Sequence, residues 1–476
     1  MLVDLSIQEL AQGLRKNTFT IKDLVEECFL QIEKHNPSLN ALISVRDKTL
    51  VLNEAEEKQK LLRPASSVLY GLPYILKDSY NTVGIRTTAA SNILKNFNSV
   101  YNATVHQRLQ DAGAILIGKA NMDAWGHGAT NENSDFGPVK NPYDLSRVAG
   151  GSGGGVAAAI ATRMAVFGIG EDTGGSIRNP AAWNNITALK VTYGRVSRYG
   201  CIAYASSFDT VGPTAKTVEE CTHILEVIAG KDQRDATSSP HSVPKYSQKL
   251  NTSIKGKVIG IPKELIGQGL DPEIKENLIR ATKEFSKLGV IIKEVSMPMI
   301  AYGISVYYLI APSETSSNLA RYDGIRYGKG RKYFNQETTR RIMIGTYALS
   351  AGYYDAYYKK AQQARTLFIK EYDKAFSECD ALLMPVTPTP PTKIGEAIND
   401  PVQNMLLDVY TVTQNPVGVP SLAIPSGFTK NHLPIGMQIV GKMFSEDLLL
   451  NIGYAYQQVT DWHKRKPAIL NEESSS

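Results

Sequence analysis

Two serines in glycine-rich segments and one lysine at the end of an apolar run form a set that could cleave an amide. Ser176 follows two glycines in the segment 172–178 (DTGGSIR), Ser152 lies within the run 150–155 (GGSGGG), and Lys77 ends a short apolar run. Glycines before a serine let the backbone turn sharply and direct successive N–H groups at one point. Acyl transfer needs such donors, because negative charge develops on the carbonyl oxygen as the carbon becomes tetrahedral.

Each segment alone also has a purely structural interpretation. The run 150–155 opens an alanine-rich helix and could be a phosphate cradle, a flexible loop or a close helix contact, although it matches neither common nucleotide-binding motif. The turn before Ser176 could simply cap a helix. A lysine such as Lys77, followed by Asp78, is most often a surface or ion-paired residue. Only the combination of the three segments indicates catalysis.

The order of these residues resembles the amidase signature family. Lys77 precedes Ser152 by 75 residues, and Ser152 precedes Ser176 by 24. In that family a lysine, a serine held by a cis peptide bond and a nucleophilic serine follow in the same order. The most specific part of the resemblance is the segment 150–195, and the likeness extends as far as residues 461–465. It implies an α/β fold with a large, mixed, twisted sheet covered by helices on both faces.

Within this family the chain resembles the A subunits of glutamyl-tRNA(Gln) amidotransferases, in the segments 192–200, 317–324 and 349–360. Those subunits hydrolyse the side-chain amide of glutamine and supply the ammonia that converts Glu-tRNA(Gln) to Gln-tRNA(Gln). The resemblance implies a heterotrimer with a small C subunit and a B subunit that activates Glu-tRNA with ATP and Mg²⁺. It implies no cofactor or metal in this chain and places the tRNA mainly on the B subunit.

The same resemblance implies a Ser-Ser-Lys mechanism. Ser176 Oγ would attack glutamine to form a γ-glutamyl ester, while Ser152 would relay protons between the nucleophile and Lys77. The oxyanion would be held by three backbone N–H groups, those of Thr173, Gly174 and Gly175. A lysine accepts a proton only when its amine is neutral, and a nearby anion favours the charged form. The mechanism therefore requires Asp78 to point away from Lys77.

Glutamine recognition needs a cation for the α-carboxylate and an anion for the α-ammonium group. The resemblance places these at Arg341 and Asp408, with Tyr307 or Tyr308 near the substrate. Arg340 is a rival candidate for this cation, because the segment between Tyr327 and Arg340 is shorter in this chain than in the family. Either charge could instead be simply solvated.

Two other functions remain open from the sequence. One is a free-standing amidase that acts on another carboxamide, and the other is a noncatalytic subunit that serves as a scaffold. Several departures from the family pattern bear on this choice. Gly153 replaces a serine, Asn184-Asn185 replaces Cys-Gly, Val191 replaces a proline, and Ala124-Trp125 replaces Glu-Phe. None removes a member of the triad, but Gly153 removes a hydroxyl group that could support it.

Strands that alternate with helices predict one layered α/β domain over residues 1–476. Within it we expect an N-terminal helical segment at 1–60, a triad region at 68–215 and a substrate-pocket region at 300–440. A capping box at Ser6 begins the first of two N-terminal helices. The second is expected to end before Pro37, 74–76 should form a strand, and further helices are expected at 104–110, 218–228 and from 272 to before 289.

Composition and charge limit the other function classes. Apolar residues make up 42% and charged residues 21%, which is ordinary for a soluble enzyme. The net charge of +6 is spread without a dense basic run, so no dedicated nucleic-acid patch is expected, whereas a weak nucleic-acid contact stays open. No apolar run reaches about 18 residues, and the N-terminus has no secretory or transit pattern. The four cysteines have no metal-ligand spacing. These features predict a reduced protein without a membrane span, and they favour a bacterial cytoplasm while an organelle stays open.

Overall fold

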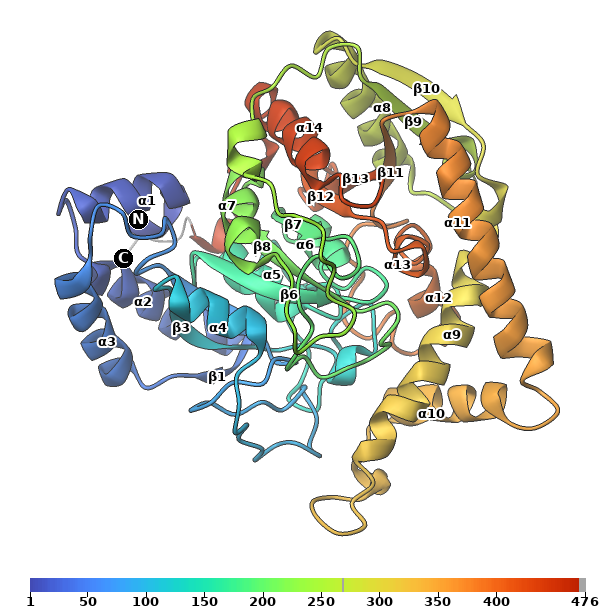
Figure 1. The fold of residues 1–476 in the computed structure, drawn as a ribbon, viewed down its shortest axis with the longest axis horizontal. Helices are drawn as coiled ribbons and strands as arrows, with labels where there is room; N and C mark the ends of the chain where they lie inside the picture. Colours follow the sequence, from blue (N-terminus) through green and yellow to red (C-terminus); the bar gives the residue numbers. More distant parts are fainter. Residues whose placement is uncertain (268, 471–476) are drawn as a thin grey trace.

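An eleven-stranded mixed sheet runs through the protein (Figure 1). The computed structural model describes residues 1–267 and 269–470. The strand order is β1-β3-β2-β6-β8-β7-β12-β13-β11-β9-β10, and β4 and β5 form a separate pair. The strands are β1 (Leu42–Val45), β2 (Pro73–Lys77), β3 (Ile115–Ala120), β4 (Lys140–Asn141), β5 (Asp144–Val148), β6 (Phe167–Asp172), β7 (Thr187–Lys190), β8 (Thr210–Ala215), β9 (Val258–Pro262), β10 (Ile291–Val295), β11 (Ala381–Pro385), β12 (Ser421–Phe428) and β13 (Pro434–Gly441).

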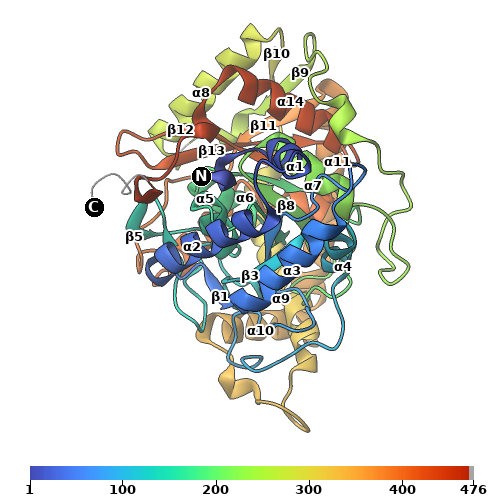
Figure 2. The same ribbon diagram turned by 90° about the vertical axis from the view of Figure 1, so that its left-hand side faces the viewer.

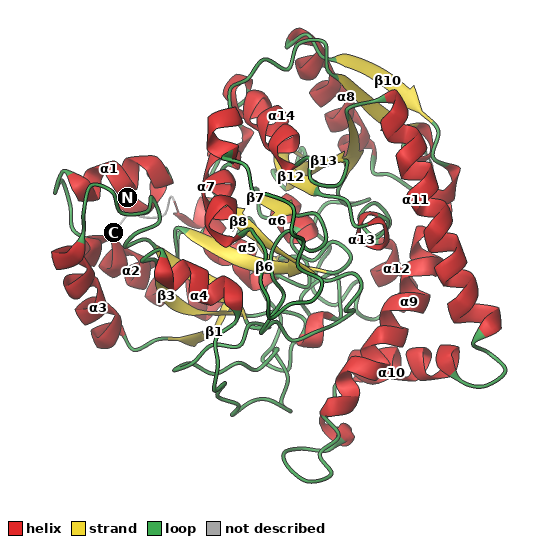
Figure 3. Ribbon diagram, in the orientation of Figure 1, coloured by secondary structure: helices red, strands yellow, loops and turns green. Residues whose placement is uncertain are grey.

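Helices cover both faces of this sheet, as the family resemblance implies (Figure 3). They are α1 (Ile7–Arg15), α2 (Ile21–Leu39), α3 (Lys48–Leu61), α4 (Thr104–Asp111), α5 (Gly154–Ala161), α6 (Arg178–Trp183), α7 (Val218–Ile228), α8 (Pro272–Lys287), α9 (Gly303–Asn318), α10 (Gln336–Leu349), α11 (Lys360–Glu378), α12 (Pro401–Leu406), α13 (Gln414–Val417) and α14 (Glu446–Val459). No helix in the described ranges is long and apolar enough to cross a membrane.

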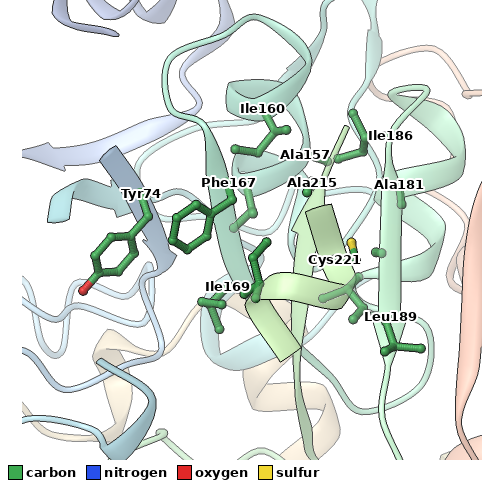
Figure 4. Packing of buried hydrophobic residues seen from close by; sticks show 14 of the residues in the cluster. Tyr74, Ala157, Ile160, Phe167, Ile169, Ala181, Ile186, Leu189, Ala215 and Cys221 are labelled. Atoms are coloured by element: carbon green, nitrogen blue, oxygen red, sulfur yellow. The ribbon is translucent and has the colours of Figure 1, made fainter. Parts of the chain in front are cut away.

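Two parallel neighbours in the sheet position the catalytic candidates. Strand β2 pairs in parallel with β6, with Leu76 opposite Ile169. Both strands are entirely buried, and the rings of Tyr74 and Phe167 stack 5.4 Å apart between them (Figure 4). Because parallel strands end at the same edge, Lys77 at the end of β2 and the turn that follows β6 lie together.

The N-terminal helices share the main hydrophobic core with the sheet, and α2 contacts β2. Helix α3 lies beside β3 (Figure 2). The capping box at Ser6 is present. The expected end of the second helix was wrong: α2 continues through Pro37 to Leu39. Proline removes only one backbone donor in this last turn. The turn is held by the buried Leu39 and by Asn36, whose side chain accepts the Leu42 N–H at 2.8 Å.

The predicted strand at 74–76 and the predicted helices at 104–110 and from 272 to before 289 are confirmed as β2, α4 and α8, with ends that shift by one or two residues. The helix at 218–228 is confirmed over α7 with its capping box. Helices α9, α10 and α11 stand to one side of the sheet and carry part of the region expected to hold the substrate pocket (Figure 1).

Candidate active site

Lys77 is buried and joined directly to Ser152. The Lys77 amine donates a hydrogen bond to Ser152 Oγ at 2.7 Å and another to the carbonyl oxygen of Glu171 at 3.2 Å. The Lys77 side chain is 1% exposed. The lysine and the first serine, 75 residues apart in the chain, therefore meet as the resemblance implies.

Ser152 lies between the lysine and the loop of the second serine. The Gly151–Ser152 peptide bond is cis. The carbonyl of Ser152 accepts the backbone N–H of Asp123 at 3.1 Å, which ties this loop to the segment after β3. The next residue, Gly153, donates its N–H to the carbonyl oxygen of Ser176 at 3.0 Å. A main-chain hydrogen bond therefore holds the two serine loops against each other.

The turn that carries Ser176 is built around a buried ion pair. Arg178 binds both carboxylate oxygens of Asp172 at 3.0 Å, and neither side chain is exposed. Burial alone would raise the pKa of Asp172, but the Arg178 guanidinium lowers it to about 2. Asp172 also accepts the Gly175 N–H at 2.9 Å. A bidentate arginine–carboxylate pair fixes orientation as well as charge, so it sets the shape of the turn.

The three backbone donors expected at the oxyanion differ in their present partners. Gly175 N–H is bound to Asp172, whereas no hydrogen bond within residues 1–267 and 269–470 occupies the N–H groups of Thr173 or Gly174. Tyr307 lies directly against this turn, because a Cβ atom at Gly174 would lie 2.6 Å from its ring. Thr173 and Gly174 therefore have the freer donors for a developing oxyanion.

Asp78 meets the requirement that it point away from Lys77. Its carboxylate pairs with Lys119 at 3.0 Å and accepts the Thr88 N–H at 2.9 Å. Another acid takes the neighbouring position: Glu171 Oε2 lies 3.7 Å from Lys77 Nζ. The sequence did not single out Glu171.

Asp209 adds a second unexpected acid behind the turn that carries Ser176. Burial, with the neighbouring Glu171, raises the pKa of Asp209 above its usual range. It accepts the hydroxyl hydrogen of Thr173 at 2.7 Å and so positions the first residue of the turn.

Arg341 is buried in a cluster of tyrosines. Its Nη1 donates to the hydroxyl of Tyr204, and its guanidinium lies 5.1 Å from the centre of the Tyr308 ring. Glu337 accepts from its Nε at 2.6 Å. Arg340, the rival candidate, is half-buried, contacts the same Glu337 and lines a neighbouring cavity of about 430 Å³. The structure thus brings Arg341, and not Arg340, to the tyrosine cluster.

Asp408 lies in the same cluster and near the turn that carries Ser176. Its carboxylate accepts the Tyr308 hydroxyl at 3.1 Å. Burial raises the pKa of Asp408 to about 7, although the nearby Arg341 opposes this shift. The hydroxyl of Thr411 bridges the carbonyls of Asp408 (3.1 Å) and Gly174 (2.6 Å). A guanidinium and a carboxyl group are therefore held beside the serine loops, as recognition of an α-amino acid would require.

The structure accounts for two departures from the family pattern. Gly153 permits the close contact between the serine loops, because a Cβ atom there would lie 2.7 Å from the Ser176 carbonyl oxygen. Asn185 has a φ of 55°, a left-handed conformation that asparagine tolerates better than most residues. Its side chain also binds the carbonyls of Trp462 and Arg465 at 2.8 and 3.0 Å.

A further departure strengthens packing at the edge of the site. Ala124 and Trp125 are both buried, and the Trp125 ring packs against Tyr322 at 4.7 Å and Phe334 at 5.7 Å. These two aromatic residues lie at the ends of the segment that joins α9 to α10. Trp125 therefore anchors the base of that segment.

Several residues of the site could not be identified from the sequence. Arg178 had the clearest signal, because it follows Ser176 by two positions. No sequence pattern marks Tyr204 or Glu337, the two residues that hold Arg341. No cluster of potential metal ligands occurs among the residues that the structure describes.

The chain matches the Amidase family model over residues 23–450. It is 45% identical to the A subunit of glutamyl-tRNA(Gln) amidotransferase from Geobacillus sp. (strain WCH70), over 98% of this chain and all of the relative. It is 46% identical to the corresponding protein from Alkalilimnicola ehrlichii, over 97% and 98%. The crystal structure of the corresponding protein from Thermotoga maritima superposes with a TM-score of 0.84 at 36% identity, covering 97% and 96% of the two chains. The chain therefore belongs to the amidase family, whose signature its serine loops carry.

Proposed function

We propose that this chain is the glutaminase subunit of a glutamine-dependent Glu-tRNA(Gln) amidotransferase. The observation that carries the proposal is the hydrogen bond of 2.7 Å between Lys77 and Ser152, in a buried site that also holds Arg341 and Asp408. The high identity to the A subunits, over nearly the full length of both chains, supports the same function.

In the proposed reaction Ser176 Oγ attacks the side-chain carbonyl carbon of glutamine. The proton of the Ser176 hydroxyl passes through Ser152 to Lys77 and then to the leaving nitrogen, so that the C–N bond breaks and ammonia departs. A γ-glutamyl ester of Ser176 remains. Water attacks this ester, its proton returns to Ser176 by the same route, and glutamate is released.

The turn held by Asp172 and Arg178 would stabilise the negative charge of the tetrahedral intermediate. The N–H groups of Thr173 and Gly174 would donate to the oxyanion, and Gly175 would join them only by leaving its bond to Asp172. One such donor typically lowers the barrier by about 2.7–4 kcal/mol. Because the donors belong to a turn with buried supports, they are positioned before the substrate arrives.

Recognition of glutamine uses the two opposite charges of the tyrosine cluster. Arg341 would bind the α-carboxylate and Asp408 the α-ammonium group, with Tyr307 and Tyr308 packed beside the substrate. Tyr307 contacts both the Gly174 backbone and the Tyr204 hydroxyl (3.4 Å), so it links the recognition groups to the nucleophile turn.

The partners follow from the proposed reaction. Ammonia must be used before it equilibrates with water, so a second subunit must present activated Glu-tRNA nearby. In this proposal a B subunit binds ATP and Mg²⁺ and phosphorylates the tRNA-bound glutamate, and a small C subunit completes the cytoplasmic heterotrimer.

Co-expression with candidate B and C subunits tests the proposal. We expect Gln-tRNA to form from Glu-tRNA with glutamine as the nitrogen donor. Lys77→Ala should lower glutamine hydrolysis by at least about 100-fold, because general acid–base catalysis contributes about 10²–10⁴, while the exposed Lys95→Ala should have no effect. Turnover of other amides without transamidation would indicate a free-standing amidase. A Ser176 that resists a serine-directed acylating probe would indicate a scaffold.

A further inference from the structure

The segment between α9 and α10 concentrates positive charge on an exposed loop, here called the basic loop (residues 321–333). It carries five basic side chains and one acidic side chain, although the whole chain has a net charge of only +6. These cations do not stand out as a dense basic run in the sequence, because tyrosines and glycines separate them. Figure 1 shows the loop projecting from the lower end of α9, away from the sheet. Charge that is dispersed along the sequence is therefore gathered at one protrusion.

The cations of the basic loop are available to a partner. They are all exposed: Arg321, Arg326, Lys329, Arg331 and Lys332. The ion pairs of the flanking helix α10 join Glu337 with Arg340 and Arg341 and do not include them. The single acid of the loop, Asp323, accepts the Ile325 N–H at 2.9 Å within the loop itself. The loop thus presents nearly uncompensated positive charge.

Exposed aromatic rings alternate with these cations. Tyr327 is 88% exposed and Tyr333 is 43% exposed. Lys329 and Lys332 lie 5.0 and 5.5 Å from the centre of the Tyr333 ring. Proteins bind flexible or single-stranded nucleic acid with two features: basic side chains that neutralise the phosphates, and aromatic rings on which the bases stack. An acidic protein surface would need the cations but would not need a free ring.

The base of the basic loop is fixed although its tip is exposed. Tyr322 and Phe334 both pack on Trp125, as described above. The side chain of Asn335 also donates to the carbonyl oxygen of Asn133 at 2.7 Å. The two helices that the loop connects carry Tyr308 and Arg341. A partner bound to the loop would therefore lie at the end of the helix pair that forms the glutamine pocket.

We propose that the basic loop binds the phosphate backbone of an RNA and stacks an unpaired base on Tyr327. The identity of that RNA as a tRNA rests on the proposed function, in which Glu-tRNA must approach the complex. This chain would then contribute its own contact to the tRNA, in addition to those of the B subunit.

Fluorescence anisotropy of the full-length chain with a labelled, unaminoacylated tRNA(Gln) transcript tests the proposal across a salt series. Each neutralised phosphate contributes about 0.7–0.9 to the slope of log K against log salt. A variant that neutralises four cations should therefore bind at least about ten-fold more weakly and lose about 3 from that slope. The four substitutions are Arg326→Gln, Lys329→Gln, Arg331→Gln and Lys332→Gln.

A matched control removes the same net charge from the exposed faces of α8 and α11. Its substitutions are Lys275→Gln, Lys283→Gln, Lys370→Gln and Lys374→Gln. The control should retain the wild-type affinity and slope, and equal losses in both variants would overturn the proposal. Thermal unfolding followed by circular dichroism checks that the loop variant is folded. If it is not, the charge reversal Lys329→Glu with Lys332→Glu takes its place.

Tyr327→Ala separates RNA from an acidic protein as the partner. It should weaken tRNA binding several-fold without changing the salt slope, because base stacking is largely independent of charge. Poly-L-glutamate that competes as well as tRNA, together with an unaffected Tyr327→Ala variant, would overturn RNA in favour of an acidic polypeptide. Gln-tRNA formation is assayed in parallel on the complex that this chain forms with the co-expressed B and C subunits. Its absence would refute the proposed function, whereas a failure of RNA binding alone would refute only this inference.

Discussion

In the proposed function, lowering the pH from about 8 to about 6 should weaken the capture of glutamine, because Asp408 would have to be ionised to bind the α-ammonium group. Burial raises the pKa of Asp408 to about 7 in the free protein. The value of kcat/KM reports ionisation of the free enzyme. With a pKa of about 7, the ionised fraction falls from about 0.9 to about 0.1 over this range, so kcat/KM should fall about ten-fold through this group alone.

A comparison of glutamine with glutaramate separates the titration of Asp408 from the titration of the catalytic groups. Glutaramate is glutamine without its α-amino group, so its use should not depend on the charge of Asp408. The ratio of kcat/KM for glutamine to that for glutaramate should therefore carry the ten-fold change, measured by ammonia release at each pH.

The variant Asp408→Asn completes the test. Removing one partner of a buried charge pair costs about 2–5 kcal/mol, so KM for glutamine should rise at least about 30-fold. The KM for glutaramate should not rise in this variant. The ratio of kcat/KM for glutamine to that for glutaramate should no longer depend on pH. A variant that loses both substrates equally, or keeps the ten-fold fall in the ratio, would refute the assignment of Asp408.

Two further changes test the supports of the site. Glu337→Gln should raise KM for glutamine several-fold with little change in kcat, because Glu337 holds Arg341 at 2.6 Å and does not contact the triad; a fall in kcat at constant KM would contradict this role. Trp125→Ala should lower the free energy of unfolding by about 3–5 kcal/mol, the usual cost of truncating a buried aromatic residue. Trp125→Phe serves as the control, and a melting temperature for the alanine variant equal to that of the control would refute the anchoring role.

Local sequence signals were sufficient for the elements that carry Lys77, Ser152 and Ser176. The apolar run before Lys77 and the glycines around both serines are properties of neighbouring residues, and the helix starts follow from capping residues. Contacts between distant segments could not be predicted in this way. Glu171 meets Lys77 only because β2 and β6 are adjacent in the sheet, and nothing near Glu171 in the chain indicates that pairing.

The same limit explains the recognition residues. Arg340 and Arg341 are adjacent in sequence, and only the rotation of α10 about its own axis determines which of them faces the tyrosines. Tyr204, which binds Arg341, comes from a loop 137 residues earlier. Family resemblance suggested Arg341, but the physical choice between the two arginines depends on helix phase and burial.

The contacts of Arg178 have a consequence for the timing of biosynthesis. Besides Asp172, this arginine binds the side-chain oxygens of Gln414 and Gln438, which are translated 236 and 260 residues later. A nascent or truncated chain that lacks them leaves the guanidinium beside Ser176 only partly satisfied. Because the ribosome delivers the N-terminal part first, a polypeptide that already contains Lys77, Ser152 and Ser176 still has an unfinished turn. The hydrogen bonds around Arg178 can therefore be complete only after residue 438 has left the ribosome.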